Sequence, residues 1–157
     1  MIVFHGSDRE IVKPDILHSR KEVDFGAGFY TTPLEEQAKN WCRKFIRKGK
    51  QGIVSVYNFD ETAFEKYHTK KFETYSDEWL DFISHCRSGQ DLSDYDIVMG
   101  GVANDRVFDT IELYFENLIS RVEAVGRLAM EKPNMQICFR RQEILDNYLK
   151  FERSYRV

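Results

Sequence analysis

One continuous segment near the N-terminus constrains the fold most, because a complete helix pattern there is followed directly by a strand pattern. We expect Thr32 to cap the helix, Pro33 to take its first position and Glu35 to complete a capping box. Apolar residues then follow at helical spacing, namely Leu34, Ala38, Trp41, Cys42, Phe45 and Ile46. The helix is expected to end at Gly49, and 52–59 (GIVSVYNF) alternates as a half-buried strand does.

The rest of the chain mixes both kinds of element. We expect further strands at 1–4, 29–32, 95–102, 135–139 and 148–157, and further helices at 76–86, 104–125 and 142–146. Strands and helices do not alternate regularly as βαβ units would, so the order indicates an α+β fold. A chain of 157 residues without internal repeats or low-complexity linkers fits a single domain over 1–157.

Composition excludes several classes of protein. An apolar share of 42% argues for a folded globule, and a net charge of −3 disfavours nucleic-acid binding through bulk charge. The three cysteines form no CxxC pair, so we expect reduced thiols, with Cys42 and Cys86 buried. The histidines at 5, 18, 68 and 85 lack metal-ligand spacing, so no metal is expected. Without a signal-peptide pattern or a membrane-spanning run, the expected location is the cytoplasm, with no membrane partner.

Two glycine-containing motifs stand out, FHGS at 4–7 and DFGAGFYTT at 24–32, and Gln136 opens a late strand. Together they resemble the ADP-ribosyltransferase superfamily, in the branch named for a His, a Tyr and a Glu that includes diphtheria toxin and the poly-ADP-ribose polymerases. The ordered set HGS…DFGxGFYTT…QA..W…YD.V.GxVA.D…QICF is similar to an uncharacterised bacterial family placed in that superfamily, and it covers most of the chain.

The resemblance implies a fold and a setting. The expected fold is two small packed sheets split by an NAD cleft, with flanking helices. The expected partners are NAD, as substrate, and a macromolecular acceptor, either protein or nucleic acid. A bacterial source, a toxin-like role and a small partner protein encoded nearby follow by analogy alone.

The first motif is expected to hold the nicotinamide end of NAD. A pocket can grip the carboxamide with one backbone N–H and one C=O where no side chain projects, and Gly6 meets that requirement. His5 is expected to bond ribose hydroxyls, and Ser7 to add a hydroxyl contact. On this hypothesis Gly6→Val abolishes NAD binding and leaves the fold intact. The alternative for His5 is a structural histidine.

The second motif is expected to supply an aromatic wall. Tyr30 would stack on the nicotinamide ring, an interaction that contributes about 0.5–1.5 kcal/mol beyond area burial. Tyr30→Ala is then expected to weaken nicotinamide binding, and Tyr30→Phe to be nearly neutral for it if stacking rather than the hydroxyl matters. Gly26 and Gly28 would let the loop turn sharply against the dinucleotide. Trp41, eleven positions beyond Tyr30, matches the aromatic that forms the opposite wall in the polymerases. For both aromatics, burial in the core is the alternative.

The third motif departs from the branch, because Gln136 stands where a glutamate is usual. An amide can orient a ribose hydroxyl but cannot balance the positive charge that develops as nicotinamide leaves, and losing one such partner costs about 2.7–4 kcal/mol of barrier lowering. We therefore expect Gln136→Glu to preserve or raise NAD hydrolysis. The alternative is that Gln136 only begins a strand and faces solvent.

Several polar residues are candidates for auxiliary roles. Asp105 and Glu143 are candidate substitute carboxylates. The segment before the predicted helix at 104–125 offers acceptor or phosphate contacts from Asn104, Asp105 and Arg106, with helix capping as the alternative for the first two. Possible pyrophosphate partners are Arg20, Arg87, Arg140 and Arg141.

Three functions remain open at this point. The first is an NAD-dependent ADP-ribosyltransferase in which His5, Tyr30 and Gln136 carry the chemistry. The second is a non-catalytic module that binds NAD or ADP-ribose, which the neutral Gln136 favours. The third is an NAD glycohydrolase, in which water replaces the macromolecular acceptor.

Overall fold

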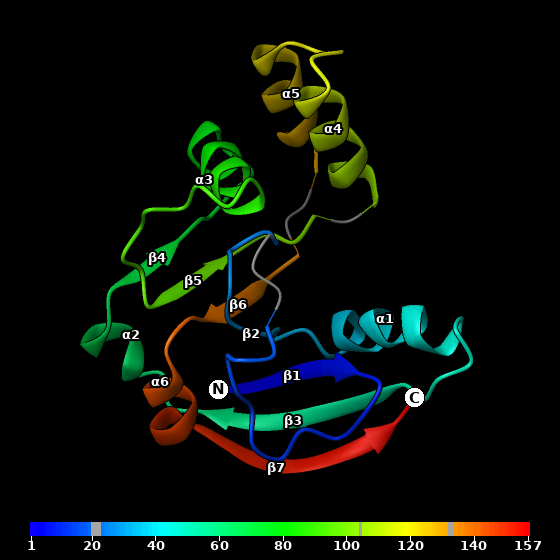
Figure 1. Cartoon of the computed structure of the whole chain (residues 1–157), viewed down its shortest axis with the longest axis vertical. Coiled ribbons are helices and arrows are strands. Elements are labelled where there is room, and N and C mark those ends of the chain that lie inside the picture. Colours follow the sequence, from blue (N-terminus) through cyan, green and yellow to red (C-terminus); the bar gives the residue numbers. More distant parts are fainter. Residues whose placement is uncertain (20–22, 104, 132–133) are drawn as a thin grey trace.

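A β-bridge between Phe4 and Thr32 joins two small sheets in the computed structural model, which describes residues 1–19, 23–103, 105–131 and 134–157 (Figure 1). The first sheet is antiparallel, with the order β1 (Ile2–Ser7), β3 (Ile53–Phe59) and β7 (Leu149–Arg156). The second has the order β2 (Phe29–Thr31), β6 (Gln136–Phe139), β5 (Ile97–Gly100) and β4 (Thr69–Lys71). In it, β4 and β5 run parallel and the other pairs antiparallel.

The helices flank these sheets. They are α1 (Glu35–Ile46), α2 (Ala63–Lys66), α3 (Asp77–Arg87), α4 (Asp105–Phe115), α5 (Arg121–Leu128) and α6 (Gln142–Tyr148). Helix α1 packs against β1 of the first sheet, and α4 packs against α5. Figure 1 shows the α4–α5 pair at the end of the molecule farthest from β7. The predicted α+β class is therefore confirmed.

Strand β6 connects the two main parts of the hydrophobic core because all four of its residues are buried. Cys138 faces a cluster that includes Trp79 of α3 and Ile111 of α4. Its neighbours Ile137 and Phe139 face the opposite cluster, which reaches the first sheet. Successive side chains of a strand point to opposite faces, so one short strand serves both clusters. The first residue of β6, Gln136, is polar and is buried as well.

The predicted N-terminus of the first helix is wrong in detail. Helix α1 begins at Glu35 after Leu34, with no side-chain cap. Thr32 is instead held by the bridge to Phe4, and its hydroxyl accepts a hydrogen bond from the backbone N–H of Leu34 at 3.0 Å. Glu35 accepts a hydrogen bond from the hydroxyl of Tyr155 rather than closing a capping box. The tertiary bridge therefore overrides the local capping signal.

The predicted long helix at 104–125 is two helices. Asn117 has a positive φ of 58°, which ends the helical path after α4. Ser120 then caps α5 by accepting a hydrogen bond from the N–H of Glu123. The short elements α2 and β4 were not predicted, whereas the cap of α3 by Ser76 is confirmed.

Two further sequence predictions concern the thiols and the membrane. Cys42, Cys86 and Cys138 are free and buried, as expected for the first two. None of the helices within the described ranges has the length and apolarity needed to cross a bilayer.

Candidate functional site

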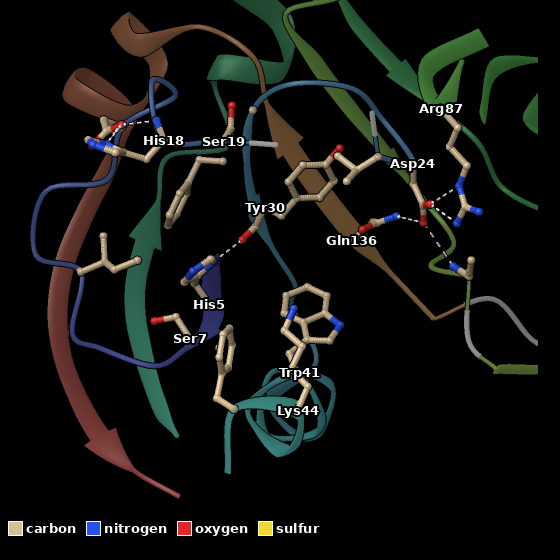
Figure 2. Close-up of a pocket in the computed structure, with 18 of the residues that line it drawn as sticks. His5, Ser7, His18, Ser19, Asp24, Tyr30, Trp41, Lys44, Arg87 and Gln136 are labelled. Carbon is tan, nitrogen blue, oxygen red and sulfur yellow. Dashed lines mark hydrogen bonds and ion pairs between the residues drawn. The ribbon is translucent and has the colours of Figure 1, made fainter. Parts of the chain in front are cut away.

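A cavity of about 800 Å³ opens where β1 and β2 diverge from their bridge (Figure 2). Its walls come from β1, the loop before β2, β2 itself, helix α1 and the ends of α3, α4 and β6. The residues that line it include His5, Gly6, Asp24, Tyr30, Trp41, Arg87 and Gln136. The cavity therefore brings together residues from all three sequence motifs.

The backbone of Gly6 points to the open edge of β1. Met1 exchanges backbone hydrogen bonds with Phe59 of β3, whereas Phe4 exchanges them with Thr32 on the other side of the strand. Backbone groups in an antiparallel strand alternate between its two edges, so Gly6 shares the orientation of Phe4. The N–H and C=O of Gly6 thus project from the free edge of the strand, and Gly6 lines the cavity.

The reason for glycine at this position is packing, however. A Cβ on Gly6 would lie 2.2 Å from the main-chain oxygen of Ala38 and 3.1 Å from Sγ of Cys42, both in helix α1. The close approach of the helix to the strand is therefore enough to require glycine here. The expectation that Gly6→Val leaves the fold intact is wrong for this reason.

His5 presents one ring nitrogen to the protein and keeps the other as an acceptor. Its Nδ1 lies 2.6 Å from the main-chain oxygen of Tyr30, and a carbonyl can only accept, so Nδ1 carries the proton. The ring stacks on Phe29 at 4.5 Å. Burial lowers the pKa of His5 to about 4, so the neutral ring leaves the Nε2 lone pair available near neutral pH.

Tyr30 contributes its ring to the cavity and its hydroxyl to the preceding turn. The hydroxyl donates to the main-chain oxygen of Gly26 at 2.6 Å and accepts from the N–H of Phe25 at 3.0 Å. Burial raises the pKa of Tyr30 well above its usual value. The hydroxyl therefore holds the turn in place, which gives it a structural role that the sequence did not indicate. The expected effect of Tyr30→Phe on nicotinamide binding stays a prediction.

Trp41 lies on helix α1 and lines the cavity, and Figure 2 shows its ring beneath Tyr30. It is half-buried and belongs to none of the three clusters of buried apolar residues found among the described parts of the chain. Of the two alternatives for Trp41, the structure therefore favours a cavity wall over a core position. Lys44 and Phe45 extend the same wall.

Gln136 is only 4% exposed and lines the cavity, so the interpretation that it faces solvent is wrong. Its Nε2 lies 3.3 Å from Oδ2 of Asp24 and 3.4 Å from the main-chain oxygen of Gly101. Both neighbours can only accept hydrogen bonds, which assigns the NH₂ group to that side. The Oε1 atom is therefore the one left to accept a hydrogen bond.

Asp24 is the carboxylate that sequence reasoning missed. Its Oδ1 accepts hydrogen bonds from Nε and Nη2 of Arg87, at 3.0 and 2.7 Å. Its Oδ2 faces Gln136 and also the N–H of Ala103 at 3.4 Å. Figure 2 shows Asp24 between Gln136 and Arg87. Asp24 begins the second sequence motif, which was a signal for its importance, but its partners are 63 and 112 positions away.

Two other predicted site residues also lie at the cavity. Ser7 lines it, and its hydroxyl donates to the main-chain oxygen of Arg9 at 2.5 Å. Gly28 lines it as well, but a Cβ there would lie 2.5 Å from Sγ of Cys138, so packing on β6 again explains the glycine.

The remaining candidates lie elsewhere. Glu143 pairs with Arg141, Arg141 also pairs with Asp96, and Arg140 is held by Asp91 and Ser93. The exposed side chain of Arg106 pairs with Glu131. None of these four candidates lines the cavity, in contrast to Arg87. Asn104 and Arg20 lie outside the described residues, as does the side chain of Asp105.

Across the described ranges, no group of three or more His, Cys, Asp or Glu side chains is arranged to hold a metal ion.

A family model described as a protein of unknown function (DUF3990) matches residues 1–151. The chain belongs to this family. The match includes every residue that lines the cavity and ends within β7, so the site lies inside the part of the chain that matches DUF3990. No curated protein and no solved structure matches the chain.

Proposed function

We propose that this DUF3990 protein is an NAD-dependent ADP-ribosyltransferase, and that the cavity between β1 and β2 binds NAD by its nicotinamide end. The two sheets with a cavity at their divergence would then be the split sandwich of that superfamily. The observation that carries the proposal is the orientation of the Gly6 backbone at the free edge of β1.

A strand edge suits the nicotinamide carboxamide for a chemical reason. The amide has one acceptor oxygen and one donor NH₂ group, and a single residue at a free edge offers one N–H and one C=O side by side. Gly6 provides that pair at the cavity wall. This contact needs only the backbone, so it is compatible with the packing of the Cα atom of Gly6 on helix α1.

The side chains beside this edge suit a ribose. His5 offers the Nε2 lone pair and Gln136 offers Oε1, and both atoms accept hydrogen bonds. Neighbouring ribose hydroxyls are donors, so two acceptors on the cavity wall match a diol. The aromatic rings of Tyr30 and Trp41 would contact the flat nicotinamide from the sides.

The proposed reaction replaces one bond at the ribose anomeric carbon with another. The bond from that carbon to the nicotinamide nitrogen breaks, and its electron pair leaves with neutral nicotinamide. A nucleophilic atom of the acceptor forms the new bond and releases its proton. With water as the acceptor, the same steps give NAD glycohydrolysis.

One observation favours a second candidate, a non-catalytic module that binds NAD or ADP-ribose. Gln136 is neutral, and the charge of the adjacent Asp24 is balanced by Arg87. Such a site offers little net negative charge to stabilise a developing cation.

Nicotinamide release decides between these functions. The purified protein is incubated with NAD carrying a label in the adenosine part, with and without cell extract, and free nicotinamide is measured by chromatography. Release with labelled macromolecules supports the transferase, and release with only free labelled ADP-ribose supports the glycohydrolase. NAD binding without release, measured by calorimetry, supports the module.

A matched pair of histidine variants tests the site assignment. His5→Ala removes the ribose acceptor and is expected to weaken NAD binding. His68→Ala removes a half-exposed histidine outside the cavity, paired with Asp94, and should bind NAD as wild type does. Equal NAD affinity of His5→Ala and wild type would remove the support for this cavity.

A further inference from the structure

We propose that Asp24 is a positioning residue for Gln136, and that the two side chains act as one carboxylate–amide pair beside the ribose. This inference rests on the proposed function. Asp24 holds the amide nitrogen of Gln136 and thereby turns Oε1 toward the substrate. Arg87 in turn holds Asp24.

The hydrogen bonds of Asp24 leave its carboxylate little freedom. Arg87 donates two N–H groups to Oδ1, and Gln136 and Ala103 donate to Oδ2. The side chains of Asp24 and Arg87 are only 14% and 18% exposed, so water competes weakly for these bonds. Residues from the loop before β2, from α3 and from β6 are therefore held together at the cavity wall.

Gln136 needs such support because an amide has two chemically different ends. A glutamine free to rotate would present NH₂ or oxygen to a ribose hydroxyl. Two acceptors, Asp24 Oδ2 and the main-chain oxygen of Gly101, fix the NH₂ end. The acceptor end is thereby preorganised, which matters because misplacing a catalytic contact by about 1 Å costs on the order of a hundredfold in rate.

The same geometry explains a glutamine at this position in chemical terms. A glutamate at 136 would place a carboxylate oxygen about where Nε2 now lies, 3.3 Å from Oδ2 of Asp24. Two carboxylates at that distance repel each other, and one of them takes up a proton or moves away. The expectation that Gln136→Glu preserves or raises NAD hydrolysis is therefore replaced by its opposite.

An exchange of the two side-chain types tests the pair. Asp24→Asn and Gln136→Glu are each expected to lower kcat for nicotinamide release by about a hundredfold, with a smaller change in KM. The double variant Asp24→Asn/Gln136→Glu removes the repulsion between the two carboxylates and keeps one negative charge near Arg87, while the carboxylate at 136 still faces the main-chain oxygen of Gly101. It should therefore release nicotinamide at least about tenfold faster than Gln136→Glu alone.

A matched control separates positioning from loss of stability. Asp91 forms an ion pair with Arg140 that is buried to a similar degree, at 12% and 14% exposure, but neither residue lines the cavity. Asp91→Asn should lower the unfolding temperature as Asp24→Asn does, while the folded protein keeps the wild-type kcat. The folded fraction of each variant is measured by circular dichroism.

The outcomes distinguish this inference from the proposed function. Suppose that wild type releases nicotinamide. The pairing alone is then overturned if Asp24→Asn or Gln136→Glu has the wild-type kcat, or if the double variant has no higher kcat than Gln136→Glu. If wild type binds NAD but releases no nicotinamide, the NAD affinities of wild type, the two single variants and the double variant are measured by calorimetry instead. Non-additive losses of affinity then support the pair, and additive losses overturn it. Wild type that neither binds NAD nor releases nicotinamide overturns the proposed function, and the pairing with it.

Discussion

Nδ1 of His5 donates a hydrogen bond to the main-chain oxygen of Tyr30 across 2.6 Å, and so ties β1 of the first sheet to β2 of the second. The bond lies one residue beyond the Phe4–Thr32 bridge on β1 and continues the junction with a side chain. It also sets the tautomer of the ring, which makes His5 an acceptor toward the cavity. Structure and site therefore depend on the same imidazole.

The first prediction concerns stability at acid pH. The pKa of His5 is about 4 in the folded protein, below its ordinary value of 6.5, because burial disfavours the charged ring. Above pH 6.5 neither state binds the extra proton, whereas between pH 6.5 and 4 the unfolded chain binds it and the folded protein does not. Stability should therefore fall as the pH falls through this range, by up to about 1.4 kcal/mol per pH unit.

The comparison for this prediction is His5→Asn, whose amide can still donate to the oxygen of Tyr30 but does not titrate. Denaturant unfolding at several pH values should show a smaller loss between pH 6.5 and 4.5 for the variant than for wild type. Parallel curves for the two proteins would contradict a His5 that stays neutral in the folded protein.

The second prediction separates two glycines. Gly6→Ala should destabilise the fold severely or prevent folding, because its Cβ meets the backbone oxygen of Ala38 at 2.2 Å. Gly126→Ala should instead stabilise by about 1 kcal/mol, because this exposed position in α5 has open space around a Cβ and alanine favours helix. Thermal unfolding followed by circular dichroism measures both, and equal unfolding temperatures would refute the packing argument.

The third prediction concerns the hydroxyl of Tyr30. Tyr30→Phe leaves the N–H of Phe25 and the oxygen of Gly26 without their partner and should cost about 1–3 kcal/mol of unfolding free energy. Tyr148→Phe removes a hydroxyl whose partner, Lys66, lies at the exposed surface and should cost much less. Urea unfolding of both variants is the measurement, and a neutral Tyr30→Phe would restore the interpretation that only the ring matters.

The fourth prediction concerns the cavity wall on α1. Trp41→Ala should weaken NAD binding by about tenfold, since a stacked or edge-on aromatic contributes about 0.5–1.5 kcal/mol beyond area burial. Ile46→Ala, on the same helix and outside the cavity, should leave NAD affinity unchanged. Calorimetry with both variants tests this, and an unaffected Trp41→Ala would place the nicotinamide away from this helix.

Most helices and strands could be predicted because their capping residues and apolar spacing lie within short stretches of the sequence. Ser76 caps α3 as expected, and the alternation in 52–59 corresponds to β3. The break between α4 and α5 was missed because apolar spacing continues across it, although Ser120 followed by Glu123 is itself a capping signal. Element β4 is only three residues long, too short for periodicity to reveal.

Only part of the site could be predicted from the sequence, because some of its contacts join residues that are far apart in the chain. His5, Tyr30 and Gln136 could be found from their motifs, and the structure brings them to one cavity. The role of Asp24 depends on partners from α3 and β6, and no spacing along the chain encodes that contact. The sequence also indicated that position 6 needs glycine, but only the packing of α1 on β1 reveals which neighbour imposes it.

Because Phe4 is fixed by its bridge to Thr32, the number of residues between Phe4 and Gly6 is constrained as tightly as the identity of those residues. A one-residue insertion between Phe4 and Gly6 would turn the glycine's backbone groups toward β3 and leave the free edge to its neighbour. A two-residue insertion would restore their direction but move them along the strand by about 6.6 Å, beyond the reach of the same amide. The two-residue step from the bridge to the glycine therefore has a single workable length.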